Sequence, residues 1–130
     1  MGHPNEELLR GGYEAFGKGD LDALRKDYFD QGIVWHQPGH NPLAGDYHGI
    51  DEVLGLFGRL FEITGGTFRT EVHDVLANDE HAVALAHVTA DRGDHLLDQS
   101  YVHVCHIQNG KLTEAWIHNT DQAAADAFWA

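Results

Sequence analysis

The chain has 130 residues, which is enough for one domain with its own hydrophobic core. Its formal charge of −13 would repel a phosphate backbone, which excludes nucleic acid as an expected partner. No run of about 18 apolar residues predicts a membrane-spanning helix, and the N-terminal residues lack the pattern of a secretory signal. A single cysteine, Cys105, excludes an internal disulfide and fits a reducing compartment. We therefore expect a cytoplasmic protein with a single domain over residues 1–130.

The N-terminal part of the chain predicts two helices. In residues 5–18 the apolar side chains recur at spacings of three and four, as they do on one face of a helix. Gly19 can take the left-handed conformation that ends such a helix, and Asp20 is a good N-cap for a second, short one. The side chains of the second helix that should face inward are Leu21, Leu24 and Tyr28.

The rest of the chain predicts one more helix and several strands. Residues 33–37 form a short β-run that stops at Pro38, and a loop rich in Gly, Pro and His follows. Residues 49–64 carry a helical apolar stripe. Four further strands are expected at residues 67–77, 81–91, 96–107 and 111–118, and a short helix or tail at residues 121–130. Helices first and an antiparallel sheet afterwards indicate an α+β fold.

The dipeptide Asn109-Gly110 is a strong hairpin signal and fixes a register. Counting outward from it places His103 opposite Trp116 and Tyr101 opposite His118, and directly paired residues share a face. One face then carries Tyr101, His103, Cys105, Glu114, Trp116 and His118. The other carries Val102, Val104, His106, Thr113, Ala115 and Ile117. The first face mixes aromatic and polar groups, which is typical of a pocket lining.

This order of elements, with the segment V-W-H-Q-P-G-H-N-P-L-A-G-D-Y-H-G at residues 34–49, resembles the nuclear-transport-factor-2-like superfamily. The resemblance is to its SnoaL-like branch, which is related to polyketide cyclases and ketosteroid isomerase. It implies a cone-shaped α+β roll, with three N-terminal helices packed on a curved, mostly antiparallel sheet. The small side chains that share one face of residues 81–91 would leave a cavity open there, and they are Ala82, Ala84, Ala86 and Ala90.

The same resemblance locates the catalytic positions of the ketosteroid-isomerase branch. The position of its aspartate base holds Gln37, which cannot take a proton at neutral pH. Its late-strand aspartate falls on His103, and its first-helix tyrosine falls on Gly12, with Tyr13 next to it. The resemblance therefore implies the pocket, whereas the chemistry has to be inferred from the residues that are present.

A histidine in such a pocket can act as a general acid or base near pH 7. The residues that we expect to take part in catalysis are His103, His118, Tyr101 and Gln37. Those that we expect to contact the ligand are Trp35, Phe57, Trp116, Tyr13 and Glu114.

Three other groups of residues could carry chemistry, but each also fits an ordinary structural role. His36, His40 and His48 suggest a metal site, but Pro38 breaks a helical spacing of the first two, and no metal or cofactor is expected. The carboxylates around Arg92 lie at a predicted hairpin tip, where charged residues are usually solvated. Cys105 is expected to be a small core residue.

These features predict a cofactor-independent enzyme that acts on a small, largely apolar ligand by acid–base proton transfer. Isomerisation, cyclisation or dehydration would suit this chemistry. The alternatives are a non-catalytic ligand-binding or dimerisation module and a water-activating hydrolase, for which Glu114 would be the carboxylate. A homodimer is expected through the outer sheet face, whose apolar area comes from Val102, Val104, Ala115 and Ile117.

Overall fold

In the computed structural model, which describes residues 3–130, two long helices and a curved sheet enclose one core. Helix α1 spans Pro4–Gly17 and begins with a capping box, in which the His3 imidazole accepts from the backbone N–H of Asn5 and Glu6 bonds back to His3. A single turn, α2 (Leu21–Ala23), continues into the π-helical turn η1 (Leu24–Tyr28). Helix α3 spans Ile50–Ile63, and α4 spans Gln122–Trp129. The four predicted helical segments are confirmed, and the C-terminal one is a helix.

The sheet has six strands in the order β2-β1-β6-β5-β4-β3. They span Phe29–Gln37 (β1), Gly45–His48 (β2), Arg69–Ala77 (β3), His81–Asp91 (β4), Leu96–Gln108 (β5) and Lys111–Asn119 (β6). All neighbours are antiparallel except β1 and β6. Strand β1 begins four residues earlier than expected, and β2 lies in the segment that was expected to be a loop. The predicted α+β roll is confirmed.

The predicted register of β5 and β6 is correct at the turn and wrong beyond it. Gln108 pairs with Lys111, and Asn109 has the positive φ that a two-residue hairpin turn requires. A β-bulge then leaves Thr113 unpaired, so that His106 lies opposite Glu114 and His103 opposite Ile117. A bulge adds one residue to one strand and therefore reverses which face every later side chain takes. From Glu114 onward, β6 has the opposite orientation to the one expected.

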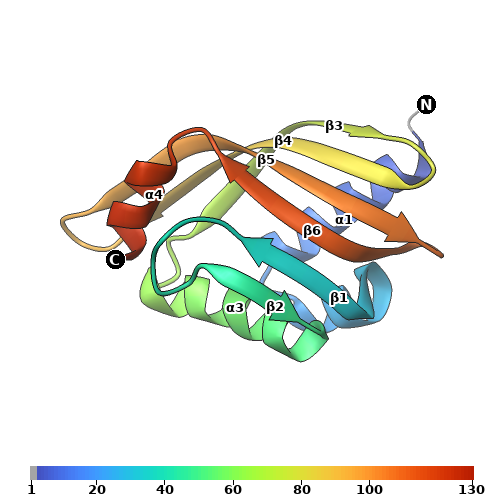
Figure 1. Cartoon of the computed structure of the whole chain (residues 1–130), viewed down its shortest axis with the longest axis horizontal. Helices are drawn as coiled ribbons and strands as arrows, with labels where there is room; N and C mark the ends of the chain where they lie inside the picture. The colour runs from blue at the N-terminus through green and yellow to red at the C-terminus, as the bar shows by residue number, and fades with distance from the viewer. Residues whose placement is uncertain (1–2) are drawn as a thin grey trace.

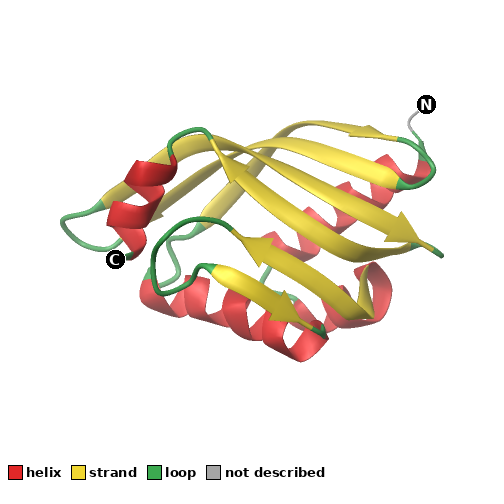
Figure 2. Cartoon of the chain, in the orientation of Figure 1, coloured by secondary structure: helices red, strands yellow, loops and turns green. Residues whose placement is uncertain are grey.

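Helices α1 and α3 lie against one face of the curved sheet, and α4 lies at one end of it (Figures 1 and 2). Between helices and sheet, Phe16 packs edge to face against Phe57, and Phe57 packs against Trp35. In the described residues, no helix covers the opposite face of the sheet (Figure 2). We call these the inner and the outer face. None of the helices within residues 3–130 is long and apolar enough to cross a membrane.

Candidate functional site

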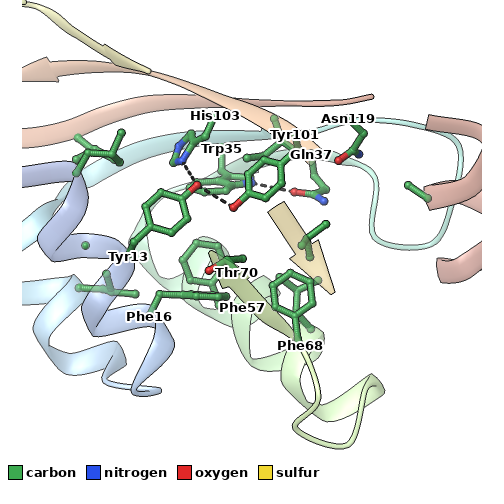
Figure 3. Close-up of a pocket in the computed structure, with 18 of the residues that line it drawn as sticks. Tyr13, Phe16, Trp35, Gln37, Phe57, Phe68, Thr70, Tyr101, His103 and Asn119 are labelled. Carbon is green, nitrogen blue, oxygen red and sulfur yellow. Dashed lines mark hydrogen bonds between the residues drawn. The ribbon is translucent and has the colours of Figure 1, made fainter. Parts of the chain in front are cut away.

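A cavity of about 100 Å³ lies between the helices and the inner face of the sheet (Figure 3). The lining residue that β4 contributes is Val88. The alanines of that strand do not line the cavity, although Ala84 lies opposite His103 and Ala86 lies opposite Tyr101. The polar side chains that line it are Tyr13, Gln37, Thr70, Tyr101, His103 and Asn119. Its main aromatic walls are Phe16, Phe29, Trp35, Phe57, Phe68 and Trp129.

Three polar side chains form a hydrogen-bonded chain at the end of the cavity next to α1. The Tyr13 hydroxyl lies 2.9 Å from Nδ1 of His103 and 2.9 Å from the Tyr101 hydroxyl. Tyr101 and His103 are two residues apart on β5, so both point inward, and Tyr13 meets them from α1 (Figure 3). Gly11 lets helix α1 pack closely against η1, since a Cβ at this position would lie 2.7 Å from the Tyr28 ring. We call Tyr13, Tyr101 and His103 the polar chain of the cavity.

Burial keeps all three members of the polar chain neutral. His103 is only 3% exposed, and this burial lowers its pKa to about 4, because an imidazolium would lose its hydration. Burial raises the pKa of Tyr101 to about 12, and burial also raises the pKa of Tyr13. Nε2 of His103 is buried and has no hydrogen-bond partner among residues 3–130. The polar chain can therefore share protons with a ligand at neutral pH without carrying a charge.

A second polar pair lies where β1 ends. The indole N–H of Trp35 donates to Oε1 of Gln37 over 3.0 Å, and the Trp35 ring lies 5.0 Å from the His103 ring. The hydrogen bond to Trp35 holds the Gln37 amide beside the cavity, with Asn119 of β6 near it (Figure 3). Tyr13, Trp35, Gln37 and Phe57 thus lie at the cavity, as expected. Asn119 and Thr70 were missed, the first because of the register error in β6.

Three predicted site residues lie elsewhere. Glu114, Trp116 and His118 are on the outer face, because the bulge at Thr113 reverses β6. These three side chains do not line the cavity, so the prediction that they lie there is wrong. Within residues 3–130, the cavity lining includes no aspartate or glutamate. The alternative of a water-activating hydrolase needs such a carboxylate, and Glu114, which was expected to supply it, lies on the outer face.

The outer face instead carries a cluster of imidazole and carboxylate groups. The two ring nitrogens of His36 each lie 2.7 Å from a carboxylate oxygen, one of Asp46 and one of Glu114. Partial burial alone would lower the pKa of His36, but hydrogen bonds to Glu114 and Asp46 outweigh it and raise the pKa. The His36 ring also stacks on Trp116, with ring centroids 5.1 Å apart. Two carboxylates of this face are thereby paired with one imidazole, whose protonated form they favour.

Ala115 and Ile117 do not belong to the outer face, which corrects the patch expected at a dimer contact. Ala115 is fully buried, and Ile117 lines the cavity. The half-buried apolar side chains that do lie on the outer face are Val34, Val83, Leu85, Val102, Val104 and Trp116.

The other candidate groups have structural contacts. His40 lies in the loop after β1, where its backbone N–H donates to Asp126, and His48 ends β2, where its backbone N–H donates to Glu52. Among residues 3–130, no three His, Cys, Asp or Glu side chains are grouped so as to hold a metal ion. The guanidinium of Arg92 donates to the carbonyl of Phe128 over 2.6 Å and so holds the end of α4. The Cys105 thiol is buried and donates to the carbonyl of Ala82, and burial raises its pKa to about 12.

Comparisons with known proteins agree with this architecture. The model of the SnoaL-like domain matches residues 9–115. The Mycobacterium tuberculosis protein Rv0034, whose function is uncharacterised, is 31% identical over 125 residues, which is 95% of each chain. The structure of Bal32a, from a soil-derived mobile gene cassette, is similar with a TM-score of 0.94 and 36% identity over 98% of this chain and 97% of that one.

More distant structures share the fold. A protein of Jannaschia sp. CCS1 that is assigned to the SnoaL-like polyketide cyclases superposes with a TM-score of 0.80 at 16% identity, over 98% of this chain and 92% of that one. TerC, co-crystallised with polyporic acid, superposes with a TM-score of 0.83 at 18% identity, over 97% of this chain and 98% of that one.

Proposed function

Because the chain belongs to the SnoaL-like domain family, we propose that it is a cofactor-independent enzyme that acts on a small, largely apolar ligand by proton transfer. Isomerisation, cyclisation or dehydration through an enol is the chemistry that the site suits best. The observation that carries the proposal is the polar chain Tyr13–Tyr101–His103, which is buried at one end of an otherwise mostly apolar cavity.

In this mechanism the polar chain polarises an oxygen of the ligand. Tyr101 passes its proton to that oxygen and regains one through Tyr13 from Nδ1 of His103, while Nε2 of His103 takes up the proton that leaves the neighbouring carbon. His103 thus also acts through Tyr13, since its Nδ1 bonds to the Tyr13 hydroxyl. Such assistance is effective in a dry site, where one hydrogen bond to developing charge is worth more than in water. Gln37 and Trp35 would orient the ligand at the other side of the cavity.

The exchange of carbon-bound protons tests the proposal without a known substrate. A small cyclic ketone such as cyclohexanone, incubated in D₂O, should exchange its α-protons faster with the protein than without it, as followed by NMR. Tyr101→Phe should lower the catalysed rate by roughly 10²-fold, the usual contribution of a general acid. His103→Gln should also lower this rate and change its pH profile. The matched control is Tyr47→Phe, because the Tyr47 hydroxyl bonds to the Leu43 carbonyl outside the cavity.

A non-catalytic ligand-binding module is the second candidate. The observation in its favour is that the residues lining the cavity include no carboxylate that could serve as a strong base. Under this reading the ketone would bind and would exchange its protons no faster than in buffer. Mass spectrometry of ligands that co-purify with the protein would then identify what the cavity carries.

A further inference from the structure

The charge of the cavity restricts what it can bind. Within the described residues, the lining includes no aspartate, glutamate, lysine or arginine. Its one imidazole, that of His103, is neutral, because burial lowers its pKa to about 4. An ionised group that entered would give up its hydration and find no opposite charge, which is strongly unfavourable. The part of a ligand that occupies the cavity is therefore uncharged.

The size of the cavity restricts the ligand further. The volume of about 100 Å³ is below the roughly 150 Å³ of an engineered apolar cavity that binds benzene. One small ring fills such a space. A larger molecule would have to leave the rest of its structure outside the cavity.

The unpartnered nitrogen of His103 gives the polar chain a direction. A neutral imidazole carries its proton on one of two nitrogens. A proton on Nε2 would leave a buried N–H with no acceptor, because Nε2 has no hydrogen-bond partner among residues 3–130. A proton on Nδ1 leaves only an unused lone pair at Nε2, and buried acceptors without a partner are less rare than buried N–H groups without one. Nδ1 therefore donates to the Tyr13 hydroxyl.

The remaining protons follow from that choice. Since the Tyr13 oxygen accepts from His103, its own proton goes to the Tyr101 oxygen, 2.9 Å away. Tyr13 then does not take the Tyr101 proton, which is free for a ligand.

We propose that the cavity selects an uncharged compound of about one small ring, whose carbonyl or ether oxygen accepts a hydrogen bond from the Tyr101 hydroxyl. This names the ligand class for the function proposed above and rests on it for the cavity being a ligand site. It does not require that the bound compound react.

The direction of the polar chain is tested first, without a ligand. In ¹⁵N NMR spectra of the labelled protein at pH 7, the two nitrogens of a neutral imidazole have distinct shifts, so the tautomer is read directly. Nδ1 of His103 should be the protonated nitrogen. A proton on Nε2 would reverse the chain and overturn the inference.

Ligand selection is tested with three probes of matched shape. Cyclopentanone offers an acceptor oxygen, methylenecyclopentane replaces that oxygen by a CH₂ group, and cyclopentanecarboxylate adds a negative charge. Binding is measured by chemical-shift titration to the wild type, to Tyr101→Phe and to the control Tyr47→Phe. The loss of Tyr101 should weaken cyclopentanone binding roughly three- to tenfold, the net worth of one hydrogen bond. It should leave methylenecyclopentane binding within twofold, and the carboxylate should not bind.

The outcomes separate this inference from the proposed function. Equal effects of Tyr101→Phe on ketone and alkene, or binding of the carboxylate inside the cavity, would refute the ligand class. Failure of both uncharged probes to bind would refute it as well. Ketone binding with the expected dependence on Tyr101, but without α-proton exchange, would support the ligand class while contradicting the catalytic proposal.

Discussion

The buried imidazole of His103 should make the stability of the protein depend on pH in a specific way. Burial lowers its pKa to about 4, whereas the imidazole of an unfolded chain has a pKa of about 6.5. Between these values the unfolded state binds the proton and the folded state does not, so stability is lost as pH falls. The contribution is fully present above about pH 6.5. It is lost progressively as pH falls toward 4 and is gone below that pH.

The size of the effect follows from the two pKa values. One pKa unit corresponds to about 1.4 kcal/mol, so the span from about 6.5 to about 4 amounts to about 3 kcal/mol of unfolding free energy. That is a large share of the ~5–15 kcal/mol that stabilises a typical domain. The carboxylates of the chain also titrate near the lower end of this range, so the His103 contribution has to be isolated by difference.

Urea unfolding of the wild type and of His103→Gln, at steps from pH 8 to pH 4, isolates that contribution. Glutamine keeps hydrogen-bonding capacity and cannot be protonated in this range. Relative to the variant, the wild type should lose about 3 kcal/mol between pH 6.5 and 4. His118→Gln, on the exposed end of the outer face, controls for the loss of an imidazole outside the cavity. Parallel stability curves for the wild type and His103→Gln across the whole range would refute the reasoning.

Three further predictions concern other parts of the fold. Despite its partial burial, hydrogen bonds to Glu114 and Asp46 raise the pKa of His36. The stability that His36 contributes is therefore fully present below about pH 6.5 and is lost as pH rises past the raised pKa. In urea unfolding, His36→Gln should remove this loss of stability at alkaline pH. Gly39 has φ +104°, and a Cβ there would lie 2.2 Å from the carboxylate of Asp126. Gly39→Ala should therefore lower the free energy of unfolding by about 2 kcal/mol or more and lower the melting temperature with it. An unchanged melting temperature would contradict this. We also expect a homodimer through the outer face, because it carries half-buried apolar side chains such as Val102 and Val104 and because Asp46, Glu114 and Asp98 are paired there with imidazoles. In sedimentation at micromolar concentration the wild type should be a dimer and Val104→Glu a monomer, whereas a monomeric wild type would contradict the expectation.

Local signals in the sequence predicted most of the helices and strands and the α+β class, whereas the cone-shaped roll was implied by the resemblance to the nuclear-transport-factor-2-like superfamily. The helical spacing of apolar residues located α1 and α3, and Gly19, with φ +69°, ends the first of them as expected. The Asn109-Gly110 turn gave the hairpin of β5 and β6 because a two-residue turn allows few geometries. Strand β2 was missed because Gly45–His48 is short and pairs at the edge of the sheet, where half-exposed polar residues give no alternating pattern.

The candidate site was predictable on β5 and only partly on β6. The alternation of β5 runs without a break from Tyr101 to Cys105, so His103 was placed correctly. In β6 the apolar residues Leu112 and Ala115 are three apart, which is incompatible with a strict period of two and is the signal of the bulge. Extending the hairpin register through that break moved Trp116 to the wrong face.

The bulge at Thr113 also decides the electrostatics of the cavity. Without it, Glu114 would point inward, where the described lining offers no cation to compensate a carboxylate. With it, Glu114 lies on the outer face and bonds to the imidazole of His36. A buried carboxylate without a partner is far more costly than the neutral side chain of Ile117 that lines the cavity instead. One unpaired residue in β6 thus keeps Glu114 on the imidazole-rich outer face and leaves the cavity with polar groups that are all neutral. The proposed ligand class depends on this neutrality of the cavity.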